Sequence, residues 1–543
     1  MKGGVAQALA LSFLLLALFL PREVPARSSG PPVSLFPGHS APRKGVSSTP
    51  LSAPSAGWSG DVSPKGKALP ESFWQGTPRA LADTLLAHLP VTRSPSLQGL
   101  ERRLLLSPAK APRGPDAAGL DLPGLRARLL LSLGEVSAAR AVITAAAQRK
   151  RGPLWRLSVD AAAAAGDLDQ ACGTVHKRIR AVRGLFWQRA LIACQALEGK
   201  ISEAGLGLQI LAEEQAVKGD GLTLAVDNLA HHSAGKVLKE LFRPDPLLLR
   251  LIVASGLGLS PSLVSGLSPA LAFSLAQDEK AAPETRILAA LRAARFGAFG
   301  AKPLRALFSA APGALPPGPK FSPARRFAAI AKAANPAERL ARISEFARRF
   351  GRDGSFVLAA RLLAPSLRAI EPDPSLAASA LDAARLSLAA GERRRAERWT
   401  ALVPASEGRR LALLLHLAQK PGEAGENREQ DSAEVAQSVL SLALFAGLGK
   451  AVSTEAWLRL PPPSWTAAGR LEAPAVSWLD LAEAARAKRI GETVLEAIIV
   501  AGSGGRLSTD PFVLYTAVSS LRRVGLIGAA RRLALEAALG SGL

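Results

Sequence analysis

One pattern decides the fold of this chain: it reads GEVSAA at residues 134–139, GDLDQA at 166–171 and GKISEA at 199–204. In each copy an alanine is the fifth residue after the glycine, and the glycines lie 32 and 33 residues apart. Apolar segments with helical periodicity precede and follow each glycine. A glycine at that place can adopt the left-handed conformation that reverses the chain between two antiparallel helices. The small alanine then lets the second helix pack closely on the first.

Two later stretches carry the same pattern, GERRRA at 391–396 and GLIGAA at 525–530. The predicted turn glycines are therefore Gly134, Gly166, Gly199, Gly391 and Gly525. The pattern resembles the tetratricopeptide repeat, whose helix-turn-helix units of about 34 residues stack into a solenoid. The large aromatic residues of that family are mostly missing here, and a helical bundle in which the pattern recurs by chance is the alternative. The even spacing favours an all-α, tetratricopeptide-like solenoid of helical hairpins.

The composition agrees with an all-α fold. The chain of 543 residues is 48% hydrophobic but only 5% aromatic, and alanine and leucine, both strong helix formers, supply most of the apolar content. The formal net charge of +24 could attract a polyanion such as nucleic acid, lipopolysaccharide or an anionic membrane surface. The basic residues are dispersed, however, and aromatic residues are not interleaved with them as in single-strand binding platforms. Their spacing favours solvated helix faces.

The first residues have the layout of a secretory signal peptide. Lys2 precedes an apolar run of 16 residues at 5–20, Pro21 follows, and Val24-Pro25-Ala26 offers a cleavage site after Ala26. An inner-membrane anchor formed by residues 5–20 is the alternative, but the run is shorter than the roughly 20 residues that span a bilayer. We expect a periplasmic or secreted protein.

The string FWQRALIACQALEG at 186–199, in an exported chain rich in alanine and leucine, resembles uncharacterised helical-repeat proteins of GC-rich Gram-negative bacteria. This resemblance implies no activity.

Proline, serine and glycine divide the chain. Residues 27–69 are predicted to form a disordered tether after the signal peptide at 1–26. One α-helical repeat domain is expected at 70–311 and a second at 324–543, joined by a Pro/Gly linker at 312–323. The middle is less regular. Its long apolar stretch at 247–276 is interrupted by Gly256, Pro261 and Pro269, which favours short buried helices over a membrane span.

Cys172 and Cys194, the two cysteines, are predicted to form a disulfide. They fall on expected helices at 168–181 and 185–198, and each lies 11 residues from Arg183 in the turn. In an antiparallel hairpin they therefore lie at the same height. The alternative is a pair of buried reduced cysteines.

The sequence contains no strong catalytic motif and implies no cofactor, metal or small-molecule ligand. Two Ser-x-x-Lys strings, Ser107 to Lys110 and Ser233 to Lys236, lack the further motifs of penicillin-interacting enzymes. His231-His232 has no partner at metal-ligand spacing, and His416 is expected to be partly buried with a hydrogen bond.

Two groups of charged residues are interpreted structurally. Asp167 and Asp169 are expected to complement the positive end of the helix after Gly166. Arg393, Arg394 and Arg395, with Glu392 and Glu397, are expected on a solvated helix face, and a patch for an anionic ligand is the alternative.

We therefore expect a non-catalytic, exported scaffold that binds another cell-envelope protein, because solenoids offer extended binding surfaces. One alternative is a basic protein that binds polyanions or membrane surfaces. Another is a cell-wall enzyme, which would need two carboxylates, or a nucleophile and a base, converging in a cleft.

Overall fold

The computed structural model describes residues 68–115, 122–148, 154–214, 221–231, 236–310, 315–352, 354–419, 438–458 and 475–542. All of them belong to one compact unit, Pro54–Leu543. The predicted signal peptide with Ala26, the alternative anchor at 5–20 and the predicted tether up to residue 67 lie outside the described residues. Leu69 is already buried, and its N–H donates to Ser107 Oγ at 2.9 Å, so the folded part includes this residue.

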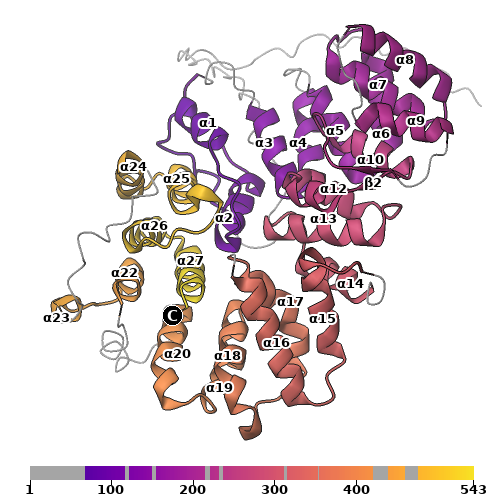
Figure 1. Ribbon diagram of the computed structural model, residues 1–543. Helices are drawn as coiled ribbons and strands as arrows, with labels where there is room; N and C mark the ends of the chain where they lie inside the picture. Colours follow the sequence, from indigo (N-terminus) through magenta and orange to yellow (C-terminus); the bar gives the residue numbers. More distant parts are fainter. Residues whose placement is uncertain are drawn as a thin grey trace, which may run out of the picture. The chain divides into compact units, whose positions relative to one another are not determined.

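The described residues form 26 α-helices, a few short 3₁₀ turns and two strands of two residues each, so the all-α prediction is confirmed (Figure 1). The first part contains α1 (Arg79–Ala87), α2 (Pro95–Leu106), α3 (Leu122–Ser132), α4 (Val136–Gln148), α5 (Trp155–Ala165), α6 (Leu168–Arg178), α7 (Leu185–Leu197), α8 (Ile201–Glu214) and α9 (Gly221–His231). Within it, α3 packs on α4, α5 on α6 and α7 on α8, and each pair also contacts the next helix in sequence.

The five glycines predicted at hairpin turns all adopt the left-handed conformation there. Their φ angles are +74° at Gly134, +81° at Gly166, +81° at Gly199, +85° at Gly391 and +82° at Gly525. In each turn the residue after the glycine donates its N–H to a carbonyl five residues back, for example Asp167 to Ala162 at 2.9 Å. This is the 6→1 bond of the Schellman motif. The alanine five residues after each glycine is 0% exposed, which is the close packing that the pattern predicts.

Three further turns have the same hydrogen bond but lack the sequence pattern. They lie at Gly297, Gly449 and Lys488, with φ of +78°, +74° and +58°. The fifth residue after the left-handed position is lysine or threonine rather than alanine. In the third turn the left-handed residue is itself a lysine, not a glycine. The repeat therefore continues beyond the copies that the sequence reveals.

The middle of the chain is irregular, as expected. It contains β1 (Val237–Leu238), α10 (Pro246–Ala254), β2 (Gly258–Leu259), α11 (Pro261–Gly266), α12 (Pro269–Gln277), α13 (Pro283–Arg295) and α14 (Ala301–Ala310). The side chains of Asp245, Ser260 and Ser268 cap α10, α11 and α12, and each is followed by a proline, a favourable first helical residue.

These short helices are largely buried, because α10 and α12 pack back onto α5. The parallel pairing of β1 with β2 was not predicted. None of the helices in the described part of the chain is long and apolar enough to cross a membrane.

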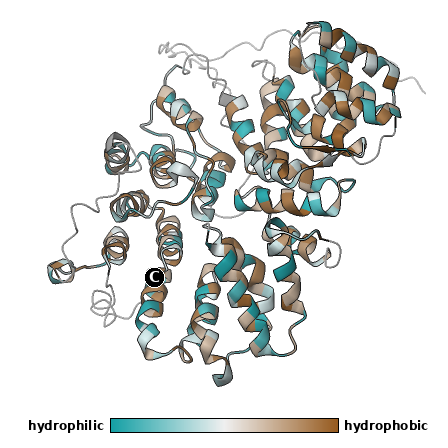
Figure 2. Ribbon diagram, in the orientation of Figure 1, coloured by the Kyte–Doolittle hydropathy of each residue, from teal (hydrophilic) through white to brown (hydrophobic). Residues whose placement is uncertain are grey.

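The last part contains η1 (Pro319–Phe321), α15 (Ser322–Ala331), α16 (Pro336–Gly351), α17 (Phe356–Arg368), η2 (Pro374–Ser379), α18 (Ala380–Ala389), α19 (Arg393–Thr400), α20 (Ala405–Ala418), α22 (Val439–Gly447), α23 (Thr454–Leu458), α24 (Ala475–Arg486), α25 (Ile490–Gly502), η5 (Ser503–Gly505), α26 (Pro511–Arg523) and α27 (Ile527–Gly540). Hydrophobic and hydrophilic residues alternate along most helices (Figure 2), and the hydrophobic ones form a core dominated by alanine and leucine. Across the predicted linker, α14 contacts α15 and α17. The division into two repeat domains stays a prediction.

The first helices pack on the last ones, which the sequence pattern does not predict. Helix α2 contacts α25 and α27, and α1 contacts α25 (Figure 1). Backbone hydrogen bonds join Gly491 N–H to Phe73 O at 2.8 Å and Arg93 N–H to Gly505 O at 3.0 Å. The N–H of Ser96 donates to Glu536 Oε2, also at 2.8 Å. In a simple solenoid each repeat contacts only its neighbours, whereas these contacts join helices at opposite ends of the described chain.

Candidate functional site

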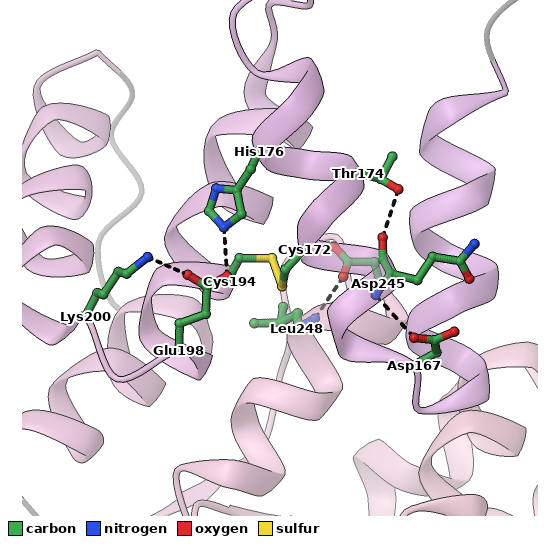
Figure 3. Close-up of a disulfide and its surroundings, with 10 residues drawn as sticks. Asp167, Cys172, Thr174, His176, Cys194, Glu198, Lys200, Asp245 and Leu248 are labelled. Carbon is green, nitrogen blue, oxygen red and sulfur yellow. Dashed lines mark hydrogen bonds and ion pairs between the residues drawn. A yellow bond between two sulfur atoms is a disulfide. The ribbon is translucent and has the colours of Figure 1, made fainter. Parts of the chain in front are cut away.

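The predicted disulfide is present between Cys172 on α6 and Cys194 on α7 (Figure 3). The two Cα atoms are 5.4 Å apart, and both side chains are buried inside the hairpin. Next to it, Glu198 accepts from His176 at 2.7 Å and from Lys200 at 2.9 Å. His176 therefore has a carboxylate partner. A disulfide of this kind is typical of proteins in an oxidising, extracytoplasmic compartment.

The serines and histidines singled out from the sequence do not come together. Ser107 Oγ accepts from Leu69 and donates to the carbonyl of Arg103, so this hydroxyl ties the start of the fold to α2. His416 is partly buried and its Nδ1 bonds to Ala412 O at 2.9 Å, as expected. His231 ends α9, whereas His232 and Ser233 lie outside the described residues.

The acidic residues after Gly166 take the role predicted for them. Asp167 is the N-cap of α6 and accepts from the N–H of Gln170 at 3.2 Å, and Asp169 lies in the first turn. Within the described ranges, no group of three or more His, Cys, Asp or Glu side chains could hold a metal ion.

A large open cavity lies between α17, α18, α19, α20 and α27. Its volume is about 1000 Å³. We call it the arginine groove, because its lining contains one carboxylate, Glu392, and seven arginines: Arg368, Arg393, Arg394, Arg395, Arg398, Arg531 and Arg532. The fold thus gathers at one cavity cations from helices that are far apart in the sequence.

Most of the groove arginines are held by neighbours. Arg368 Nε lies 2.7 Å from Glu392 Oε1, and Arg393 Nε lies 2.9 Å from Glu397 Oε1. The side chain of Arg395 is only 10% exposed and donates to the carbonyls of Leu367, Arg368 and Ile370. The expectation of a solvated helix face is therefore wrong for Arg395, because this guanidinium caps the C-terminal end of α17.

Arg394 and Arg532 are the groove arginines that make neither an ion pair nor a side-chain hydrogen bond with any described residue. Both residues are exposed. Partial desolvation lowers the pKa of Arg532 from its ordinary value. An anion in the groove would meet these two cations without first displacing a carboxylate.

The rest of the groove is apolar and aliphatic. Leu388, Leu417, Ala418 and Leu535 contribute to its lining. No aromatic side chain belongs to that lining among the described residues, so the groove offers no surface on which a base could stack. It combines positive charge with an aliphatic surface.

The sequence offered only part of this site. Arg393 to Arg395 were considered as an anion patch because they are consecutive. Arg368, Arg531 and Arg532 were missed, because they come from α17 and α27 and lie 25 or more residues away along the chain. The packing of α17 on α18 brings Arg368 to this cavity, and the packing of α18 and α20 on α27 brings Arg531 and Arg532 to it.

Two carboxylates near α5 bear on the enzyme alternative. Burial, together with the charge of Asp245, raises the pKa of Asp160 to about 7. The adjacent cavity of about 260 Å³ is lined by Asp245 and by three arginines. Asp245, however, accepts the N–H of Leu248 at 2.8 Å as the N-cap of α10. This carboxylate thus has a structural partner that accounts for its position.

No protein-family model, curated protein or solved structure matches this chain.

Proposed function

We propose that this protein is a non-catalytic, exported helical-repeat scaffold that binds an acidic segment of another cell-envelope protein in the arginine groove. The observation that carries the proposal is the lining of the groove, with seven arginines against one glutamate. Arginine is well suited to this role, because its planar guanidinium binds carboxylates through two parallel hydrogen bonds.

The aliphatic part of the groove supports a peptide as the partner. A segment that alternates acidic and aliphatic side chains could pair with Arg394 and Arg532 while its apolar side chains cover Leu417 and Leu535. Such aliphatic anchors beside charged pairs are how helical or extended peptides bind to grooves. Nucleic acid is less well matched, because the groove lining lacks aromatic side chains.

The compartment part of the proposal rests on the disulfide and on the N-terminal sequence. A Cys172–Cys194 bond persists where thiols are not kept reduced. The layout of residues 1–26 favours export through a cleaved signal, and a bacterial periplasm or the cell exterior satisfies both observations.

A second candidate function is binding to an anionic polymer or lipid surface. The net charge of +24 and the same groove favour it. The two candidates differ in how binding depends on salt. Binding to a polymer or lipid surface through many exposed charges weakens steeply as the salt concentration rises, whereas a partly desolvated peptide complex weakens less.

The test is affinity purification of the tagged protein from gently cross-linked envelope fractions at low and at high salt. The scaffold proposal predicts one stoichiometric protein partner that survives high salt and is lost from the Arg394→Gln/Arg532→Gln variant. The matched control is Arg180→Gln/Arg183→Gln, which removes the same charge from exposed residues that do not line the arginine groove. Recovery of lipopolysaccharide or nucleic acid only at low salt would favour the second candidate, and recovery of nothing would contradict both.

A further inference from the structure

A second, smaller cavity lies where the first helices of the chain meet its middle. Its volume is about 290 Å³. We call it the joint cavity; the lining residues used below are Arg93, Arg102, Glu135, Arg295, Ser355 and Arg361. They come from the segments around α2, the α3–α4 turn, the end of α13 and the start of α17. Four separate stretches of chain therefore share one small polar space.

The charges of the joint cavity do not cancel. Its lining contains four arginines and one carboxylate, Glu135. Glu135 is already paired with Arg102, whose Nε lies 2.6 Å from Glu135 Oε1. The Arg102 guanidinium also donates to the carbonyls of Leu133 and Gly297, so it joins three of the four segments. Arg93 and Arg295 have contacts of their own, since they lie over the rings of Phe296 and Phe350 at 5.2 and 5.5 Å from the ring centroids.

Arg361 is the lining arginine closest to the start of α17 in the sequence. Its guanidinium makes no hydrogen bond or ion pair with any residue in the described ranges. Desolvation lowers its pKa, the charge of Glu536 opposes this, and the like charges of Arg102 and Arg532 add to the lowering. Arg361 is nevertheless exposed, so a ligand entering from solvent can reach it.

The start of α17 adds a second, independent feature. The first N–H groups of a helix have no partners inside it, and they attract anions together with the helix dipole. Ser355 occupies the N-cap of this 13-residue helix, but its side chain caps no N–H. Ser355 is only 3% exposed, and its Oγ is buried without a hydrogen-bond partner among the described residues. A buried, unpaired hydroxyl is costly unless something binds it.

We infer that the joint cavity binds a compact oxyanion, namely inorganic phosphate or the phosphoryl end of a small phosphate monoester. The anion would accept hydrogen bonds from Ser355 Oγ, from the first N–H groups of α17 and from Arg361. The volume lies near the lower limit of about 300 Å³ for small-molecule sites, which fits a small ligand.

Such an anion would also hold the fold together. It would link the start of α17 to the segments joined by Arg102 and relieve repulsion between Arg361 and Arg102. This inference does not depend on the arginine groove, because Arg394 and Arg398 do not line the joint cavity.

Isothermal titration calorimetry on the purified full-length protein tests the inference, with chloride used to hold the ionic strength constant. Inorganic phosphate and glycerol phosphate are titrated separately, and we expect saturable one-to-one binding of at least one of them. Stronger binding of inorganic phosphate identifies the free ion as the ligand, and stronger binding of glycerol phosphate identifies a monoester. Failure of both to bind would overturn the inference.

Variants locate the site. Arg361→Gln should weaken binding at least tenfold, and Ser355→Ala should weaken it severalfold. The side chain of Arg361 is exposed and makes no hydrogen bond or ion pair with a described residue, so Arg361→Gln is expected to fold. Arg180→Gln, which removes the same charge from an exposed residue that lines neither the joint cavity nor the arginine groove, is the matched control and should bind as the wild type does. Equal affinity in Arg361→Gln and the wild type, or equal losses in Arg361→Gln and Arg180→Gln, would contradict a site in the joint cavity.

Discussion

Gly134 and Gly199 occupy equivalent turns but have different neighbours. A Cβ atom at Gly134 would lie 2.1 Å from the carbonyl oxygen of Ala298, whereas one at Gly199 would meet nothing within 4 Å. Gly199→Ala should therefore lower the free energy of unfolding by only about 1 kcal/mol, which is the cost of placing an L-residue in the left-handed conformation. Gly134→Ala should lose about 3 kcal/mol, because the turn around Ala298 must also move. Urea unfolding of both variants measures the difference, and equal losses would show that Gly134 serves only as a turn.

Glu101, buried on α2, makes stability depend on pH. Burial raises its pKa from 4.5 to about 8, with a partial offset from Arg102. Between those values the folded protein keeps a proton that the unfolded chain has lost, so the free energy of unfolding falls as pH rises from about 5 to 8. Glu101→Gln should flatten this fall and be more stable than the wild type at pH 8. Part of the pH dependence should remain in this variant, because the pKa of Glu496 is also raised to about 8.

Urea unfolding at pH 5 and pH 8 checks this prediction. Glu213→Gln on α8 is the control, because Glu213 is exposed and should leave the pH dependence unchanged. An identical slope in Glu101→Gln and the wild type would mean that Glu101 has an ordinary titration.

At the scale of elements, the disulfide fastens the α6–α7 hairpin. It closes a loop with a sequence separation of 22 residues, for which the loss of chain entropy predicts about 3 kcal/mol of stabilisation. The double variant Cys172→Ala/Cys194→Ala, and the reduced wild type, should both lose about that amount in urea unfolding. A reductant should not affect the double variant. If it left the wild type unchanged as well, the bond would contribute nothing to stability.

The hairpins were predictable because their determinants are local. A glycine with φ above zero and a small residue one turn into the next helix can both be recognised within six residues, as at Gly166 and Ala171. The turn at Lys488 was not predictable, because a lysine there gives no sign of a left-handed conformation. Lys488 is held by a hydrogen bond from its Nζ to the carbonyl of Arg523 on α26, a contact that sequence alone does not reveal.

At the scale of the whole molecule, contacts between the first and last helices make distant segments depend on each other. Phe73 is 1% exposed, and its carbonyl accepts from Gly491 N–H at the start of α25. Phe73→Ala should cost about 3 to 5 kcal/mol and should raise hydrogen exchange in α25 as well as near residue 73. Hydrogen-exchange mass spectrometry measures this coupling.

Phe308→Ala on α14 makes the same chemical change at another fully buried position and is the control. This variant should leave hydrogen exchange in α25 as slow as it is in the wild type. Unchanged exchange in α25 of the Phe73→Ala variant would show that the first helices do not stabilise the last.

The cavities were the least predictable feature for the same reason. Arg394 and Arg532 belong to one groove only because α18 and α20 pack on α27, and the charge pattern along the chain shows merely dispersed arginines. Ser355 and Arg102 likewise meet at the joint cavity although they lie far apart in the sequence. A pattern identifies local turns, whereas sites assembled from distant helices require the fold.

We propose that the arginine groove, rather than the overall positive charge, recognises an acidic partner. Fluorescence anisotropy with a labelled peptide of alternating glutamate and leucine tests it most directly. We expect Arg394→Gln/Arg532→Gln to weaken binding about tenfold or more, which corresponds to about 1.4 kcal/mol. Arg180→Gln/Arg183→Gln, which has the same net charge, should bind nearly as the wild type does. Equal weakening by both pairs would contradict it, because the peptide would then be responding to net charge alone.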